Sequence, residues 1–200
     1  MAKRPVKHQP YVVGIGGTTR LGSSTEKALR HVGREAERLG ARFEIFCGPE
    51  LILPAYTLDS PTRTPSARKL VEAMRACDAL VVASPGYHGS FSGLIKNALD
   101  YAEDMAKDPR PYLSGRAVGC IASGLGWQAI GTTLASLHTI VHALGAWSPP
   151  MGVAMSTANK VFGDAGEVLV PEVKLELDAL AAQLVEFARM RHAYEQSLNQ

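Results

Sequence analysis

Six side chains that can donate hydrogen bonds to an anion follow directly after the first apolar run of the chain. The run covers residues 11–13, and the donors are Thr18, Thr19, Arg20, Ser23, Ser24 and Thr25. A strand that ends at a helix N-terminus leaves backbone N–H groups unpaired, and the helix dipole adds to their attraction for negative charge. Hydroxyl and guanidinium groups also donate to phosphate oxygens. The stretch therefore predicts a binding site for a small phosphate monoester.

Three other interpretations of this stretch agree less well with its residues. A plain strand-to-helix turn needs only a cap, which Ser23 and Glu26 supply at capping-box spacing, and it leaves the other donors unexplained. A nucleoside-triphosphate loop is disfavoured because Ser23 stands where that motif has its lysine. A dinucleotide-binding motif begins at Gly14, but Thr19 occupies the position of its third glycine.

Two more segments rich in glycine and serine follow apolar runs later in the chain. The first contains Pro85, Gly86, Tyr87, His88 and Gly89, and the second contains Ser123, Gly124, Leu125 and Gly126. Glycine lets the backbone approach a ligand closely, and proline fixes the direction of the chain. Both segments are candidate walls of a ligand site. Tyr87 would stack on the ligand or plug a turn, and His88 would contact the ligand or lie exposed in a loop.

The elements that must position these segments alternate between strand and helix patterns. Strand patterns cover residues 11–13, 41–46, 78–84, 117–122 and 147–155, and helix patterns cover about 25–39, 65–76, 94–101, 128–144 and 171–194. The alternation predicts an α/β fold with a doubly wound, five-stranded parallel sheet in the order 2-1-3-4-5 and helices on both faces. In that order the first, third and fourth strands end at one rim, where the three segments should converge.

Composition restricts the class of protein further. The 200 residues are 46% hydrophobic and 20% charged, which predicts a single domain over residues 11–195 behind a disordered basic tail at residues 1–10. The formal net charge is +2 with both signs well mixed, so no nucleic-acid partner is expected. No apolar stretch is long enough to span a membrane, and no signal peptide is apparent. The widely separated Cys47, Cys77 and Cys120 are typical of reduced core residues in a cytoplasmic protein.

Metal and hydrolase chemistry are not expected. His138 and His142 have the spacing of helical zinc ligands, but Thr139 replaces the glutamate of a metalloprotease motif, which favours a packing or interface role. Ser123 lacks the Gly-x-Ser-x-Gly context of a hydrolase nucleophile.

Residues 16–25 and 84–100 resemble the two signature stretches of the NAD(P)H-dependent FMN reductase family, whose fold is flavodoxin-like, and the resemblance extends over about residues 11–144. It implies that Thr18, Arg20, Ser23 and Thr25 bind the FMN phosphate. It also implies that residues 85–89 lie along the isoalloxazine ring and that residues 123–126 flank its other side. Many members have an acidic residue in place of Gly86 and asparagine in place of His88.

The resemblance implies an oxidoreductase with FMN as cofactor and NADPH or NADH as hydride donor. The flavin N5 would accept the hydride, and a free flavin, a quinone or an azo compound would take the electrons, so no catalytic side chain is expected. A slot shared by donor and acceptor predicts ping-pong kinetics. The apolar helix pattern at residues 128–144 predicts a homodimer or homotetramer, which in the family completes the flavin site. A flavin-dependent monooxygenase is a further candidate partner.

Two other function classes stay open at the level of sequence. A flavodoxin-type electron carrier would bind FMN without oxidising NADPH, although this chain is longer than such carriers need and lacks their strongly acidic surface. A non-catalytic sensor of a phosphate ligand would have no affinity for flavin.

Overall fold

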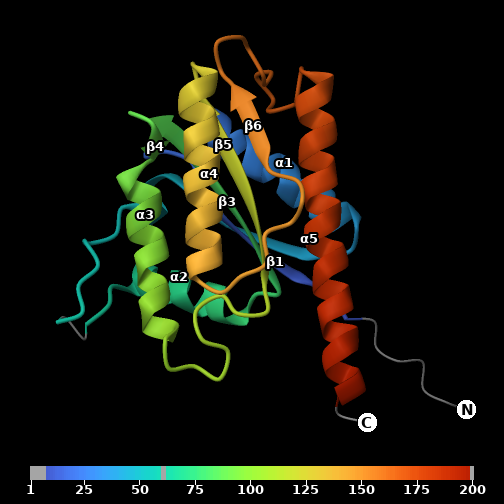
Figure 1. Ribbon diagram of the computed structural model, residues 1–200. Helices are drawn as coiled ribbons and strands as arrows, with labels where there is room; N and C mark the ends of the chain where they lie inside the picture. The colour runs from blue at the N-terminus through green and yellow to red at the C-terminus, as the bar shows by residue number, and fades with distance from the viewer. Residues whose placement is uncertain (1–7, 60–61, 199–200) are drawn as a thin grey trace, which may run out of the picture.

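The computed structural model describes residues 8–59 and 62–198, so residues 1–7 of the predicted basic tail lie outside the described residues. One central sheet is covered by helices on both faces (Figure 1). The remaining residues of the predicted tail contact the domain: His8 Nε2 lies 3.1 Å from Asp78 Oδ2, and Pro10 is buried.

Within the described residues, the sheet contains six strands. They are β1 (Tyr11–Gly16), β2 (Arg42–Phe46), β3 (Ala79–Tyr87), β4 (Ser90–Phe91), β5 (Ala117–Gly124) and β6 (Val153–Ser156). Five of them are parallel in the order β2-β1-β3-β5-β6, which confirms the predicted order. The predicted strand count of five is wrong, because the two-residue strand β4 pairs antiparallel with the end of β3. Such a short strand has no periodicity that a sequence pattern could reveal.

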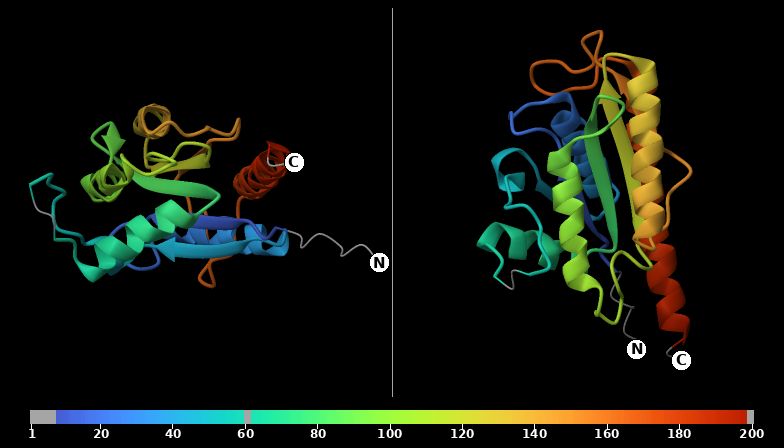
Figure 2. Two further views of the ribbon diagram at one scale, coloured as in Figure 1. Left: turned by 90° about the horizontal axis from the view of Figure 1, so that it is seen from below. Right: turned by 60° about the vertical axis from the view of Figure 1, so that its left-hand side comes forward.

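In the part of the chain that the structure describes, five α-helices cover the sheet, and each lies where the sequence predicts one. They are α1 (Ser24–Arg38), α2 (Pro65–Ala76), α3 (Gly93–Asp100), α4 (Trp127–Ala143) and α5 (Pro171–Leu198), with short 3₁₀ helices at Gly48–Leu51 and Tyr101–Met105. One hydrophobic core joins the sheet to α2, α3 and α4, and a second joins it to α1 and α5. Figure 2 shows these two layers from below the sheet. Burial on both faces explains why β1, β3 and β5 are apolar almost throughout.

Four predicted strand boundaries are wrong by two residues or more. The first predicted strand stops too early, because β1 pairs with β3 as far as Gly16. The third and fourth also stop too early, because parallel pairing continues through Pro85 and Ser123. The last predicted strand starts too early: β6 begins at Val153, and Trp147 forms only an isolated bridge to Ala117. Proline residues 149 and 150 lie between that bridge and β6. No strand pairing occurs there, so the missing N–H groups of these prolines remove no hydrogen bond from the sheet.

Side-chain caps start three of the helices as short-range rules require. Ser23, Thr64 and Ser92 each accept a hydrogen bond from the backbone N–H three residues later, at 3.3, 3.2 and 3.4 Å. Gly16 has a different requirement, since a Cβ there would lie 2.2 Å from the carbonyl oxygen of Ala83. The turn after β1 therefore leaves the sheet directly against β3.

The three cysteines are buried and form no disulfide, in agreement with the predicted reduced core. Burial raises the pKa of the Cys120 thiol to about 12, so this thiol stays protonated at neutral pH. Within residues 8–59 and 62–198, no helix has both the length and the apolar character needed to cross a bilayer.

Candidate functional site

A cavity of about 380 Å³ lies at the carboxyl ends of β1, β3 and β5. Its lining residues come from four segments and are Thr18, Arg20, Ser23, Ser24, Thr25, Pro85, Gly86, Tyr87, Ser123, Gly124, Leu125, Gly126, Ala129 and Thr157. The structure therefore brings together the hydroxyl-rich turn and the two glycine-rich segments. It does not bring His88 and Gly89 into the cavity wall.

The turn after β1 is held closed by the first residues of α1. Ser23 Oγ accepts the backbone N–H of Glu26 at 3.3 Å, while Glu26 Oε2 accepts the backbone N–H of Gly22 at 2.8 Å. The reciprocal bond of a capping box would go to Ser23, so the predicted box is shifted by one residue. Gly22 has a φ of 72°, which places it in the left-handed region that favours glycine.

The same turn presents hydrogen-bond donors to the cavity. Ser23 Oγ and Thr25 Oγ1 are buried and hydrogen-bond to each other at 3.3 Å, which uses the proton of one of them. Among the described residues, no acceptor satisfies the backbone N–H of Ser24 or Thr25, both at the positive end of α1. Donor groups arranged in this way at a helix N-terminus can bind phosphate oxygens.

Arg20 adds a positive charge at this end of the cavity. Its side chain is exposed, and it forms no ion pair with any described residue, whereas nearby Arg30 pairs with Glu26 at 2.8 Å. Thr18 Oγ1 accepts the backbone N–H of Arg20 and donates to the carbonyl oxygen of Arg20, each at 3.1 Å. Thr18 therefore fixes the backbone that carries the guanidinium group.

The second wall is a hairpin formed by β3 and β4. Tyr87 pairs with Ser90, and the two residues between them, His88 and Gly89, have φ values of 51° and 85°. Positive φ at both central positions is the requirement of a type I′ turn. Tyr87 lines the cavity with 53% of its surface exposed. The hairpin thus presents Tyr87 to the cavity, and His88 and Gly89 supply its turn.

Sequence reasoning missed a serine that anchors this hairpin. Buried Ser84 accepts the backbone N–H of Ser92 at 2.9 Å and donates to the carbonyl oxygen of Pro85 at 2.9 Å. Ser92 in turn caps α3. The end of β3, the hairpin and the start of α3 are therefore tied together behind the cavity wall.

The third wall follows the end of β5. Gly124 accepts the backbone N–H of Thr157 at 2.8 Å, which brings the segment after β6 to the cavity. Figure 2 shows that segment, in orange, at the same end of the sheet as the blue turn after β1. Leu125 and Trp127 are largely exposed, and Leu125 lines the cavity. One end of the cavity is therefore rich in donors and the other end carries apolar side chains and glycine backbone.

Close packing of α4 on β3 explains one of these glycines. A Cβ on Gly86 would lie 2.9 Å from Thr133 Oγ1 and 3.1 Å from the carbonyl oxygen of Ala129. An acidic side chain at this position, as many family members have, would need α4 to shift.

Cys47 is buried beside the turn after β1. Burial raises the pKa of its thiol, so a thiolate nucleophile is not present there at neutral pH.

Comparison with known proteins identifies the family. The sequence profile of a family described as NADPH-dependent FMN reductase matches residues 10–160. The chain belongs to this family. Its members are oxidoreductases that use FMN and NADPH, so FMN and NADPH are the cofactors of this flavin reductase. The donors at the start of α1 and the glycine-lined remainder of the cavity are chemically suited to a phosphate ester with a flat ring.

Individual relatives agree with this assignment. The chain is 27% identical over 183 residues to an FMN-dependent NADPH-azoreductase of Staphylococcus aureus, covering 86% of this chain and 92% of the relative. The solved structure of FerB, a flavoenzyme NAD(P)H:(acceptor) oxidoreductase from Paracoccus denitrificans, superposes with a TM-score of 0.72 at 21% identity, covering 91% and 98% of the two chains. A WrbA-like flavodoxin from Agrobacterium tumefaciens has a TM-score of 0.63 at 14% identity over 92% and 99%. The two structures establish that the flavin reductase has a flavodoxin-like fold.

Proposed function

We propose that this flavin reductase binds FMN in the cavity at the ends of β1, β3 and β5. The phosphate group would lie at the turn before α1, and the ring would lie between the hairpin at residues 85–87 and the segment at residues 123–126. The observation that carries this proposal is that three segments, spread over more than a hundred residues of sequence, meet around one cavity.

The phosphate end supplies charge and hydrogen bonds. The hydroxyl group of Ser24, one of the two mutually bonded hydroxyl groups of Ser23 and Thr25, and the free N–H groups at the helix start would donate to phosphate oxygens. Arg20 would neutralise the charge. Thr18 acts through the backbone of Arg20, because its hydroxyl proton already goes to the carbonyl oxygen of Arg20.

The ring end supplies shape. When bound, FMN accepts a hydride from a nicotinamide and passes electrons to an acceptor. Gly86, Gly124 and Gly126 leave the backbone accessible in the wall, and Tyr87 offers an aromatic face beside it. No acid, base or nucleophile from the protein is needed, and we assign none.

We further propose an azo compound or a quinone as the physiological electron acceptor. The partly exposed Tyr87 and the exposed Leu125, both on the cavity wall, suit a flat apolar molecule, and the relative from Staphylococcus aureus is named as an azoreductase. Donor and acceptor would use one slot in turn, so steady-state plots at several acceptor concentrations should be parallel. Intersecting lines would show that both substrates bind together.

A homodimer or homotetramer, formed through α4, is part of the proposal. The exposed face of α4 carries small residues at Gly131, Ala135 and Thr139, which allow close approach of another helix, and Trp127 lies exposed at its start. Ala135→Arg should lower the sedimentation coefficient to that of a monomer. An unchanged coefficient would place the interface elsewhere.

A partner monooxygenase would be a separate acceptor for reduced flavin. A cytoplasmic location agrees with the three free, buried thiols.

Titration of the apoprotein with FMN and with riboflavin tests the binding site directly. Riboflavin lacks the phosphate, so FMN should bind more tightly, and the difference should shrink when Arg20 is replaced. Anaerobic addition of NADPH should then bleach the flavin absorption band. Flavin binding without bleaching would indicate a flavodoxin-type electron carrier, and absence of flavin binding would favour the phosphate-ligand sensor.

A further inference from the structure

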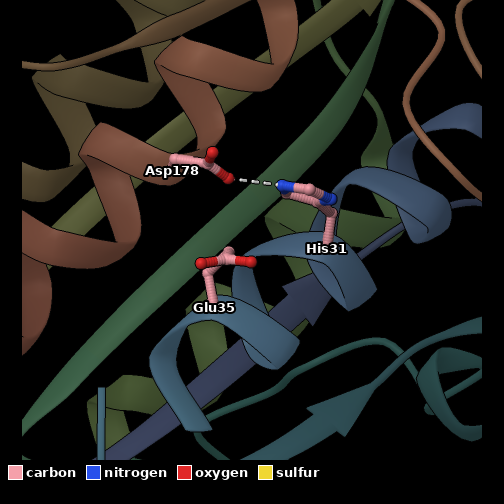
Figure 3. Close-up of side chains that lie close together, drawn as sticks. All are labelled: His31, Glu35 and Asp178. Carbon is pink, nitrogen blue, oxygen red and sulfur yellow. Dashed lines mark hydrogen bonds and ion pairs between the residues drawn. The ribbon is translucent and has the colours of Figure 1, made fainter. Parts of the chain in front are cut away.

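A cluster of three metal-ligating side chains lies between α1 and α5, outside the residues that line the FMN cavity. His31 and Glu35 are one turn apart on α1, and Asp178 reaches them from α5 (Figure 3). His31 Nε2 lies 2.6 Å from Asp178 Oδ1. One donor atom from each residue lies within 4.8 Å of the other two. The packing of α1 against α5 therefore gathers an imidazole and two carboxylates in one place.

The cluster is largely shielded from water. The side chains of His31, Glu35 and Asp178 are 8%, 19% and 27% exposed. Two carboxylates held together in such a position repel each other, and a cation between them relieves that repulsion. The existing cations lie on the outside of the cluster: Arg38 donates to Glu35 Oε2 at 2.7 Å, and Lys174 donates to Asp178 Oδ2 at 2.5 Å.

One of the three inner atoms has no partner. No donor from the described residues reaches Glu35 Oε1, whereas His31 Nε2 and Asp178 Oδ1 share a hydrogen bond. The outer oxygens, by contrast, are each neutralised by a side chain that is at least half exposed, 69% for Arg38 and 50% for Lys174. Each carboxylate thus has one oxygen paired with a solvent-exposed cation. An ion between the helices would bind Glu35 Oε1 and would displace to solvent the proton that His31 Nε2 and Asp178 Oδ1 share.

We propose that His31, Glu35 and Asp178 bind a divalent transition-metal cation, with Zn²⁺ as the best match. Imidazole with carboxylates is a common ligand set for Zn²⁺, and the two negative charges balance the ion. Ligand atoms about 2.1 Å from a tetrahedral Zn²⁺ lie about 3.4 Å from one another. The His31 and Asp178 atoms would separate slightly and Glu35 would rotate inward, both within the range of side-chain torsions.

The ion would link two parts of the chain. The helix α1 begins at the phosphate-binding turn, and α5 lies beyond residues 10–160, the part of the chain that matches the family profile. A metal bridge would therefore fix the C-terminal helix on the helix whose N-terminus faces the FMN cavity. The proposal concerns stability and does not depend on how FMN or NADPH binds.

Isothermal titration of the metal-stripped, FMN-loaded enzyme with Zn²⁺ provides the test. One Zn²⁺ should bind per chain and raise the Tm, and Co²⁺ in its place should give the absorption of a low-symmetry, protein-bound ion. A neutral amide is a weaker Zn²⁺ ligand than a carboxylate and does not balance the charge of the ion, so Glu35→Gln or Asp178→Asn should weaken binding by at least about tenfold. Glu35→Gln keeps an acceptor for Arg38 and is the variant more certain to fold.

A matched control separates ligation from a simple ion-pair network. Lys174→Gln removes the outer partner of Asp178 and leaves all three ligands, so Zn²⁺ should bind as tightly as to the native enzyme or more tightly. Absence of stoichiometric Zn²⁺ binding would overturn the proposal. Equal Zn²⁺ affinity in the native, Glu35→Gln and Asp178→Asn enzymes would also overturn it, since the ion would then bind elsewhere. An equal loss in Lys174→Gln and Asp178→Asn would overturn it as well, by showing that the cluster acts only as an ion-pair network.

Discussion

The hydroxyl group of Ser84 accepts the backbone N–H of Ser92 at 2.9 Å and so ties the end of β3 to the first turn of α3. The hairpin that carries Tyr87 lies between these two residues. One buried hydrogen bond therefore fixes the base of a cavity wall whose tip is exposed.

Replacing Ser84 with alanine should loosen that wall. The N–H of Ser92 would be left buried without its acceptor, which costs about 1–3 kcal/mol. We expect the free energy of unfolding in urea to fall by this amount and FMN affinity to fall with it. Ser66→Ala, an exposed position on α2, is the control and should change neither quantity. Unchanged FMN affinity in a clearly destabilised Ser84→Ala variant would show that the hairpin does not contact the flavin.

Replacing Arg20 with alanine should weaken FMN binding selectively. A charge-assisted hydrogen bond to phosphate contributes about 1.5–3 kcal/mol when shielded, and because Arg20 is exposed we expect about a tenfold loss for FMN. Riboflavin affinity should stay the same, and the loss should shrink at high salt. Arg34→Ala is the matched control, because Arg34 is an exposed arginine on α1 that does not line the cavity. Equal weakening of FMN and riboflavin would argue against a phosphate contact.

Replacing His88 with asparagine should stabilise the hairpin. His88 has a φ of 51°, and asparagine tolerates the left-handed region well, so a gain of a few tenths to about 1 kcal/mol is expected. A β-branched residue is poorly suited to this region, and His88→Val should be less stable than the native protein in urea. Because His88 does not line the cavity, His88→Asn should bind FMN normally. A marked drop in FMN affinity would instead assign the imidazole to the flavin site.

The pair formed by Tyr11 and Glu44 should make stability depend on pH at both extremes. Tyr11 donates to Glu44 Oε2 at 2.5 Å. This bond, assisted by Lys69, lowers the pKa of Glu44 below its ordinary 4.5, whereas burial and the same bond raise the pKa of Tyr11 above its ordinary 10.0. The unfolded chain therefore binds a proton at Glu44 as the pH falls through 4.5 and loses one from Tyr11 as it rises past 10.

Stability should consequently decline below about pH 4.5 and above about pH 10. Tyr11→Phe keeps the buried ring and removes the hydroxyl, so it should flatten both limbs of a plot of unfolding free energy against pH. Equal slopes for the native protein and Tyr11→Phe would show that this pair does not control either limb.

The order of the parallel strands and the meeting of three strand ends could be predicted because both follow from general rules. Alternating strand and helix patterns with right-handed crossovers leave few possible topologies. Pattern also located the starts of α1 and α2, since Ser23 and Thr64 cap helices through contacts with residues only three positions away.

Short-range sequence patterns did not predict features that depend on the path of more distant parts of the chain. The ends of β3 and β5 were predicted to be loops because they contain proline and glycine. In the structure the two strands pair with each other through these residues and are therefore longer. His88 was a candidate ligand contact because it lies in the glycine-rich segment after β3. In the structure His88 is part of the two-residue turn of the hairpin, and Tyr87, not His88, lines the cavity. Thr157 carried no signal at all, because only the path of the chain after β6 brings it to the cavity.

Short-range patterns in the sequence were enough to predict the α/β fold, the strand order, the resemblance to flavin reductases and the hydroxyl-rich turn. These features depend on periodicity, capping and turn chemistry, which act over a few residues. The set of residues that share the cavity wall, and the contact of His31 with Asp178, 147 positions along the chain, became visible only in three dimensions. Such meetings depend on how helices pack on the sheet, and that packing is set by the whole core and not by any short stretch of sequence.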